Sequence, residues 1–492
     1  MANLLLEPAN PKPLGAFRIL WGMILLLECW TLVKCLEDIH NVDYFHFTAR
    51  GVSFVEHLSP QVFTTAEVVI LIVCALLVTL GLWFRWAALL FTIGYTHLLL
   101  AEAAKFNNHF YLLSLITLLL CFTAADRSFS CSKKNGKLPT DPIPFWHYAI
   151  LRLQVAVIYF FGGIAKLETD WLIVREPVRF WMNHSPTIVA SIKAISYHEW
   201  FVFLIAWGGL FIDLLCPFLL MFRKTRIVAF VVLIGFHLLN SQMFLIGNFP
   251  MMGILVLLLF VPVRRGGQEI FLGRLFRSRD MEEARKFGMP GKWMVSILAV
   301  YFILQFLFPL RGLLHRPRNP SWTDTGHLFS WRMMLIEKPV HLHFYYDLPG
   351  GLPPGTSASE VYPKVAPYAS IFGSRAPHMI WQFVQGIKKN LARKGYLDVP
   401  IYVYAVSSLN GRPFQPLIDP NVNMAEVEVP AFGIPDWVTT LQEYDGPRYY
   451  PTEKSEQELA VYEAMKDWFE KNPGPGAKFL YRIRPGSPDL SR

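Results

Sequence analysis

The side chains best suited to chemistry in this sequence lie in four short polar clusters beside or within long apolar segments. In chain order, they are Asn107-Asn108-His109, Gly162-Gly163 with Lys166, His237 with Asn240, and Trp331 with Met333 and Met334. Polar groups at membrane depth are costly, so each of these clusters requires an explanation.

Lys166 is the candidate general base. It follows the Gly162-Gly163 pair, which thins a helix surface so that a ligand or a second backbone can approach closely. A lysine held partly out of water loses its proton more readily, and a neutral lysine is a competent base. The alternative is that Lys166 only extends to the lipid headgroups, and spacing alone favours that alternative.

The other three clusters also have structural explanations, which their spacing alone favours. The two asparagines would cap a helix. His237 and Asn240, three residues apart, would hydrogen-bond between helices. The methionine pair would belong to a core strand. The functional interpretation of the three clusters is a polar and aromatic lining for a lipid-soluble ligand.

Apolar segments dominate the first 312 residues. The sequence is 53% hydrophobic and only 17% charged, against about 25% charged in a typical soluble domain. A helix needs about 20 apolar residues to cross the hydrocarbon core. The candidate spans are 17–36, 64–84, 86–104, 109–125, 147–165, 200–222, 227–246, 248–263 and 293–312. We therefore predict an α-helical multispanning membrane domain of about nine helices over residues 1–312, carrying the catalytic groups, followed by a soluble α+β domain over residues 313–492.

Positive charge gathers in short loops between the apolar segments. The chain has a net charge of +9, and Lys and Arg are concentrated in loops 126–146, 223–226 and 264–292. By the positive-inside rule these loops are cytoplasmic. The N-terminus is then cytoplasmic, and with nine spans the C-terminal domain lies in a periplasm or secretory lumen. All four clusters fall on or toward this outer side, which indicates one shared site. A charge distribution of this kind does not predict a nucleic-acid partner.

The soluble domain combines strands and helices. Segments 340–346, 401–406 and 478–483 read as strands. Segments 376–394 and 455–471 read as helices, the second with a capping box formed by Ser455 and Glu458. This part contains no cysteine, and the chain has no Cys/His cluster, so neither a disulfide here nor a metal site is expected.

Five motifs, in order and spacing, resemble vitamin K-dependent γ-glutamyl carboxylases. They are Asn107–Leu112, Gly163–Trp171, Phe236–Gly247, Ser330–Met334, and Asn410–Arg412 followed by Ile418–Pro420. Each motif is weak alone, but five in the right order on a multispanning chain are a specific signal. The resemblance covers the chain from about the first span to Pro420.

The resemblance implies a carbon–carbon lyase, a peptidyl-glutamate carboxylase with a coupled vitamin K epoxidase activity. Such enzymes use reduced vitamin K, O2 and CO2 to convert glutamate in a peptide or protein to γ-carboxyglutamate. No side chain is basic enough to remove the γ-hydrogen of glutamate. The family generates a far stronger base by oxygenating the deprotonated quinol. The site lies among helices because water must be kept from that base.

The resemblance also assigns roles to residues. Lys166 is implied to start the reaction by taking a proton from the quinol, and His109 to serve the hydroquinone or oxygenation step. Cofactor contacts are expected from Asn107, Asn108, His237, Asn240, Trp331, Met333 and Met334.

The chain departs from the family pattern at several positions. Ala165 stands where the family often has the first of two lysines, Lys166 matching the second, and His327 and Phe329 replace an aromatic pair. The chain is also short, so it looks like a compact homologue of bacterial type, in which the quinol is reduced vitamin K or a menaquinol. Two alternatives stay open: a quinol epoxidase that carboxylates no peptide, and a non-catalytic membrane module that binds quinone or lipid. The protein substrate and the oligomeric state are not predicted.

Overall fold

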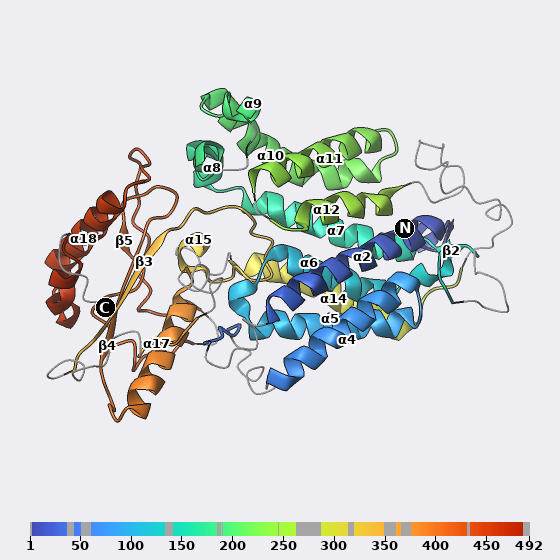
Figure 1. The fold of residues 1–492 in the computed structure, drawn as a ribbon. Coiled ribbons are helices and arrows are strands. Elements are labelled where there is room, and N and C mark those ends of the chain that lie inside the picture. The colour runs from blue at the N-terminus through green and yellow to red at the C-terminus, as the bar shows by residue number, and fades with distance from the viewer. Residues whose placement is uncertain are drawn as a thin grey trace.

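The computed structural model describes residues 2–36, 44–50, 61–132, 141–184, 188, 190–244, 246–261, 287–312, 319–348, 361–365, 375–430 and 433–485. Within these residues, a bundle of long helices lies beside a smaller unit built on a sheet (Figure 1). The bundle contains the apolar segments of the first 310 residues, and the sheet belongs to the C-terminal part.

Each predicted span coincides with a helix of the bundle. The helices are α2 (Lys12–Lys34), α4 (Gln61–Leu80), α5 (Phe84–Ala101), α6 (Asn108–Cys121), α7 (Trp146–Ala165), α10 (Glu199–Met221), α11 (Arg226–Met243), α12 (Phe249–Leu255) continued by the 3-10 helix η5 (Val256–Phe260), and α14 (Lys292–Leu310). Among the described residues, six helices are long and apolar enough to cross a membrane: α2, α5, α7, α10, α11 and α14. The multi-pass class is thereby confirmed. The count of nine stays a prediction, because α4, α6 and α12–η5 are shorter over the residues searched.

One end of the bundle is closed by backbone and arginine contacts. A short sheet pairs β1 (Pro8–Ala9) with β2 (Ile143–Pro144), so the N-terminus and the start of α7 share this end. The buried guanidinium of Arg18 donates to the carbonyl oxygens of Val78 (2.7 Å) and Phe129 (2.7 Å). These carbonyls belong to the last turn of α4 and to the loop beyond α6, and carbonyls at such positions lack helical partners. Arg18 therefore stabilises the end of the bundle that lies away from the C-terminal unit (Figure 1).

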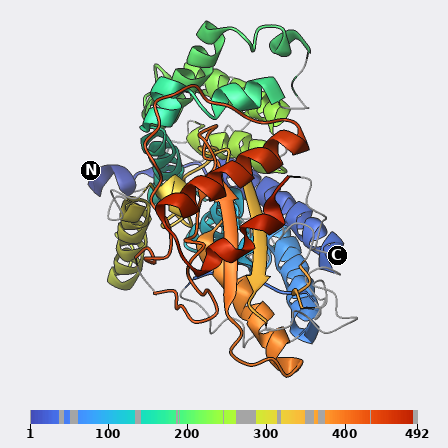
Figure 2. The same cartoon turned by 90° about the vertical axis from the view of Figure 1, so that its left-hand side faces the viewer.

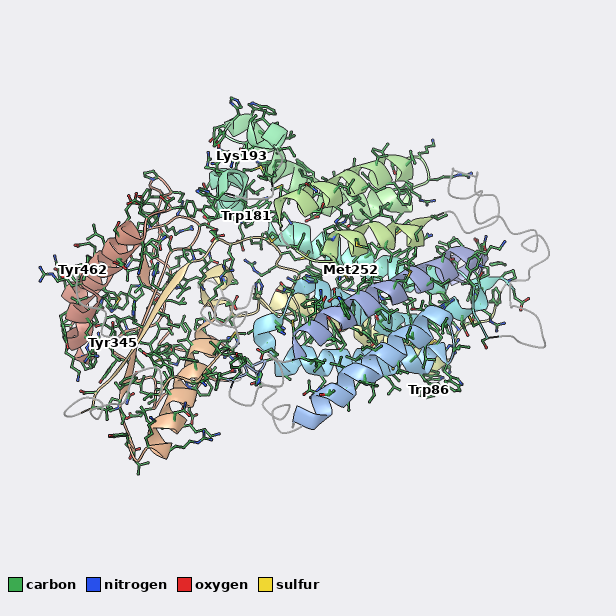
Figure 3. All side chains as sticks on the ribbon, viewed as in Figure 1. Trp86, Trp181, Lys193, Met252, Tyr345 and Tyr462 are labelled. Carbon is green, nitrogen blue, oxygen red and sulfur yellow. The ribbon has the colours of Figure 1, made fainter. Side chains whose placement is uncertain are left out.

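Large apolar side chains cover the outside of the bundle. Phe211 on α10, Val231 on α11 and Ile303 on α14 each have at least half of their surface exposed. Trp86, labelled in Figure 3, also points away from the helices. Monomeric soluble proteins rarely expose continuous apolar surfaces of this kind, and the surface suits contact with lipid.

The C-terminal unit is an antiparallel sheet with a helix on each face. Its main elements are β3 (Val340–Tyr346), β4 (Ile401–Ser407), β5 (Gln415–Pro416), α17 (Pro377–Arg393) and α18 (Lys454–Lys471), with strand order β3-β4-β5. Alternate residues of β4 face opposite helices. Val403 packs in one core with Val384 of α17, whereas Tyr404 packs in another with Met465 of α18. Figure 2 shows α18 lying across the strands.

Two details of the predicted C-terminal unit were wrong. Segment 478–483 is the end of the 3-10 helix η9 (Pro475–Ile483) and not a strand. In a 3-10 helix, residues three apart share a side. Phe479 stacks on Tyr345 with 5.0 Å between ring centroids, and the guanidinium of Arg482 lies 5.7 Å from the same ring. The predicted capping box is also wrong, because α18 already begins at Lys454 and no side chain caps it.

Short elements connect the main ones. They are α1 (Ala2–Leu5), η2 (Ala103–Lys105), η3 (Ala125–Arg127), the π-helix η4 (Asp170–Val174), α8 (Val178–His184), α9 (Ala190–Lys193) and α15 (Pro320–Thr323). Most of the predicted basic loop 264–292 lies outside the described residues.

Candidate active site

A cavity of about 580 Å³ lies where the bundle meets the C-terminal unit. Its walls come from α6, α7, α10, α11 and α12, and from segment 321–338 after α14. All predicted site residues except Trp331 line it: Asn107, Asn108, His109, Lys166, His237, Asn240, Met333 and Met334. Clusters that are far apart in the sequence are thus brought together around one space. This convergence is what the predicted topology required.

Lys166 lies at the end of α7 and is only 6% exposed. Its Nζ forms an ion pair with Oδ2 of Asp213 at 2.6 Å and donates to the carbonyl of Gly162 at 3.3 Å. The same nitrogen lies 5.3 Å from the ring centroid of Trp171. The alternative in which Lys166 extends to the headgroups is therefore wrong, since its ammonium group is held inside the protein.

The glycine pair before Lys166 brings α7 against α10. A Cβ atom at Gly163 would lie 2.5 Å from Cδ2 of Leu214, so no larger residue fits without movement. A Cβ atom at Gly162 would lie 3.4 Å from the Asp213 carboxylate and 3.6 Å from Cε of Met333. The close approach predicted from the sequence is made, and it is made by the helix that carries Asp213.

Asp213 was not among the predicted site residues. It lies within α10 and is 4% exposed. The sequence did contain the signal: it is the one carboxylate inside an otherwise apolar predicted span, 200–222. An ionisable residue at membrane depth is by default a functional candidate with a partner to be found.

His237 is fixed in the wall of the cavity by two contacts. Its Nε2 shares a hydrogen bond of 2.7 Å with the hydroxyl of Tyr159, a residue not predicted as part of the site. Gly253 of α12 lies directly against the imidazole, because a Cβ atom there would be 2.2 Å from its Cε1. Among the described residues, the buried Nδ1 of His237 has no hydrogen-bond partner. One polar atom is thus left for a ligand.

The start of α6 supplies a second polar patch. Asn107 occupies the N-cap position but makes no capping hydrogen bond through its side chain, so the simple capping explanation is wrong for it. Asn108 donates from Nδ2 to the carbonyl of Arg332 at 3.2 Å, and its buried Oδ1 has no partner among the described residues. The ring of His109 lies 4.2 Å from that of Phe110 and 6.2 Å from that of Phe249.

The Trp331 motif divides between packing and cavity. Trp331 is buried and stacks on Tyr111 with ring centroids 4.9 Å apart, behind the residues that line the cavity. Met333 and Met334 do line it. Trp331 therefore supports the wall, whereas the two methionines form part of its surface.

Charged groups gather at the end of the cavity nearest the C-terminal unit. The buried ammonium of Lys338 donates to the carbonyls of Trp322 and of Arg375 (2.8 Å). Burial lowers the pKa of Lys338 to about 8, and the charge of Asp324 only partly opposes this. Burial alone would raise the pKa of Asp324, but the nearby charges of His327 and Lys338 outweigh it and the net shift is downward. Lys338 was not predicted, because sequence spacing did not connect it to the helices.

Two acidic residues just after Lys166 bind the C-terminal unit. Asp170 receives two hydrogen bonds from the guanidinium of Arg412 (2.6 and 2.7 Å) and one from Asn410 (2.9 Å). Glu168 pairs with Arg332 at 2.6 Å. The Asn410–Arg412 motif is thereby joined to the end of the Lys166 motif, and such two-pronged Arg–carboxylate pairs also fix orientation.

The fold and the site together define a multi-pass membrane protein with a largely apolar cavity at the edge of its helical part. Residues 6–264 match the HTTM domain family, and residues 290–444 match the family described as vitamin K-dependent gamma-carboxylase, lumenal domain. The chain therefore belongs to the vitamin K-dependent γ-carboxylase family, as its motifs predicted. Membership indicates a carboxylase-like function with a vitamin K cofactor and a glutamate-containing substrate. No solved structure matches the chain.

Proposed function

We propose that this protein is a vitamin K-dependent γ-glutamyl carboxylase that couples epoxidation of reduced vitamin K, or of a menaquinol, to carboxylation of a peptide glutamate with CO2. The observation that carries the proposal is the buried Lys166–Asp213 pair in the wall of a cavity that His109 and His237 also line. An ion pair removed from water is costly unless its geometry is good, and ionisable groups at membrane depth are by default functional candidates.

The cavity has the properties that a quinol requires. Its volume of about 580 Å³ lies in the range of small-molecule sites, which are mostly apolar with a few polar groups that fix orientation. Two buried polar atoms in its wall lack partners among the described residues: Nδ1 of His237 and Oδ1 of Asn108. Each can hydrogen-bond a quinol hydroxyl, and buried polar atoms are seldom left without a partner. When bound, the reduced vitamin supplies, with O2, the strong base that side chains cannot provide.

The Lys166–Asp213 pair accepts the first proton in this proposal. At 2.6 Å, a proton on Nζ can pass to Oδ2, which leaves both groups neutral. Because the pair is buried, the neutral form is disfavoured far less than it would be in water. The amine can then take a proton from a hydroxyl held nearby, and the carboxylate holds the proton it received. Lys166 is only 6% exposed, so little water reaches this nitrogen.

The glutamate side chain of the peptide is assigned to the charged end of the cavity. Arg332 and Lys338 line that end, and positive groups there suit a carboxylate. The apolar wall formed by Met333 and Met334 lies between this end and Lys166 in our assignment. Water is excluded best in such a region, and a base strong enough to take a carbon-bound proton requires that exclusion.

The proposal includes two organisational points from the sequence. Residues 1–312 form the catalytic membrane domain and residues 313–492 an extracytoplasmic domain that closes the cavity. The N-terminus is cytoplasmic and the C-terminal domain periplasmic or lumenal. The contacts of Asp170 and Glu168 with the C-terminal unit support a site at that outer boundary.

The test uses the full chain purified in detergent, with reduced vitamin K, a glutamate-containing peptide and labelled CO2. Epoxide and labelled peptide are both expected, and both are expected to be lost in Lys166→Ala. Lys193→Ala is the matched control, because Lys193 is an exposed lysine on α9 (Figure 3). Epoxide without labelled peptide would reduce the function to quinol epoxidation. Full activity in Lys166→Ala would remove the proposed base.

A further inference from the structure

The cavity does not end at its polar groups but continues between α10 and α11. Two rows of residues line it there: Leu204, Gly208 and Ile212 on α10, and Gly235, Leu239 and Met243 on α11. In each row the residues are four apart and therefore share one helical face. The helices are consecutive and antiparallel, and α10 ends at Met221 while α11 begins at Arg226. Counting equally from this turn brings Gly208 level with Leu239, and Ile212 level with Gly235.

The two glycines leave the space between these helices open. Among the described residues, no heavy atom lies within 4 Å of a Cβ position at Gly208 or at Gly235. Gly163 and Gly253, in contrast, are glycines that neighbouring side chains press upon. Gly208 and Gly235 are thus not needed for close packing within the protein, and their small size maintains an opening.

The opening reaches the outer, lipid-facing surface of the bundle. Leu204 lines the cavity and is also 55% exposed, and Gly235 lines it and is exposed as well. Exposed apolar residues flank the gap, among them Phe211 and Leu238. α10 and α11 both qualify as membrane spans, so what lies outside this gap is hydrocarbon.

From these observations we propose that the isoprenoid tail of the quinol leaves the cavity between α10 and α11, beside Gly208 and Gly235. The inference rests on the proposed function and adds the place and the chemistry of the tail site. The polar end of the same cavity gives an independent indication of a ligand, because His237 is 1% exposed and its Nδ1 has no partner among the described residues. A headgroup held there has an apolar path to the bilayer only a few residues away along α11.

The first test compares two quinols that differ only in the tail. One is a long-tailed menaquinol, and the other is a naphthohydroquinone with a methyl group in place of the tail. Gly208→Trp and Gly235→Trp fill the opening, and their KM for the long-tailed quinol is expected to rise about tenfold, which corresponds to about 1.4 kcal/mol. Their KM for the tail-free quinol is expected to stay within about twofold of the wild-type value. Val231→Trp is the control, because Val231 is an exposed residue of α11 outside the cavity lining.

An unchanged KM for the long-tailed quinol in both glycine variants would overturn the tail site. Equal losses with both quinols would also count against it, because they would mean general damage to the site. Gly208→Leu and Gly235→Leu provide a milder pair in which folding is easier to preserve.

A second measurement does not depend on turnover and so separates this inference from the proposed function. A quinone with a photoreactive group on its tail is bound to the full chain in lipid nanodiscs and cross-linked. Labelling is expected in peptides from α10 and α11, and excess unlabelled long-tailed quinone is expected to suppress it. Labelling confined to other helices, or labelling that excess quinone does not reduce, would refute the tail site. A wild-type protein that forms no epoxide but labels on α10 and α11 would refute the proposed function alone.

Discussion

Replacing Asp213 with asparagine is expected to destabilise the protein and to abolish quinol epoxidation while hardly changing the shape of the site. Asp213 and Lys166 are 4% and 6% exposed and are joined at 2.6 Å. Removing one partner of such a pair leaves the other charge buried without compensation, which typically costs about 3–5 kcal/mol. The asparagine can still hydrogen-bond the lysine, but it cannot receive its proton.

A double-mutant cycle separates the interaction energy between Lys166 and Asp213 from the contribution that each side chain makes alone. Lys166→Met and Asp213→Leu are each expected to lower the free energy of unfolding by about 3 kcal/mol, whereas the double variant is expected to lie within about 1 kcal/mol of the wild type. The reason is that an apolar pair of similar size replaces the ion pair without leaving a lone charge. The double variant is nevertheless expected to form no epoxide, because no proton acceptor remains. Denaturant titration in detergent and epoxide measurement provide the two readouts.

The matched control is an exposed ion pair on the same chain. Lys471 and Asp467 of α18 form a pair at 2.8 Å and both are more than half exposed. Asp467→Asn is expected to change the free energy of unfolding by less than about 0.5 kcal/mol. If Asp213→Asn behaved like Asp467→Asn and retained epoxidation, the pair would not carry the proton and the mechanism proposed here would be refuted.

Three further changes test other parts of the site. Arg412→Lys loses the two-pronged contact with Asp170, so we expect the carboxylation rate to fall about tenfold. Limited proteolysis is expected to show looser attachment of the C-terminal unit. An unchanged rate and an unchanged proteolysis pattern would show that this contact is not needed. Gly253→Ala puts a methyl group within 2.2 Å of the His237 ring, and loss of epoxidation at near-normal expression is expected, whereas a neutral effect would show that the ring is free to move. Burial lowers the pKa of Lys338 to about 8, so its positive charge is present below that pH and is lost above it. We therefore expect kcat/KM for the peptide to fall as the pH rises through about 8. Lys338→Arg is expected to move this fall to higher pH, because an arginine keeps its charge.

The helices of the membrane part followed closely from the sequence. Long apolar runs have few structural alternatives, because every backbone group must be paired inside lipid. The predicted segment 147–165 is α7 (Trp146–Ala165), and 293–312 is α14 (Lys292–Leu310) apart from its last turn. Span number was harder to predict, because α6 and α12 are apolar but short. The predicted strand 478–483 was wrong for a different reason. A short run rich in apolar and aromatic residues fits a three-residue repeat as well as a strand, and here Phe479 and Arg482 both contact the ring of Tyr345.

The site was predicted where residues lie in a motif, and it was missed where partners come from elsewhere. Lys166 and His237 stood in recognisable clusters. Tyr159, the partner of His237, opens the segment that contains Lys166 but was not chosen as a site residue, and Asp213, the partner of Lys166, lay outside every cluster. Asp213 is an isolated carboxylate in an apolar helix, and only the cost of burying it marks it. Lys338 carries no sequence signal at all, because its burial arises from the way the C-terminal unit covers the cavity.

Asp170 lies four positions after Lys166, so one short stretch of backbone joins the amine to the attachment of the C-terminal unit. A displacement of Arg412 would therefore move Asp170 and the backbone between Asp170 and Lys166. A chimera that carried the helices of this chain and the C-terminal part of a relative would therefore need an arginine at the same point. Without it, the amine would lose its alignment even though every residue around it was retained. We therefore expect the residues of the helices and of the C-terminal unit that meet at this contact to be substituted together.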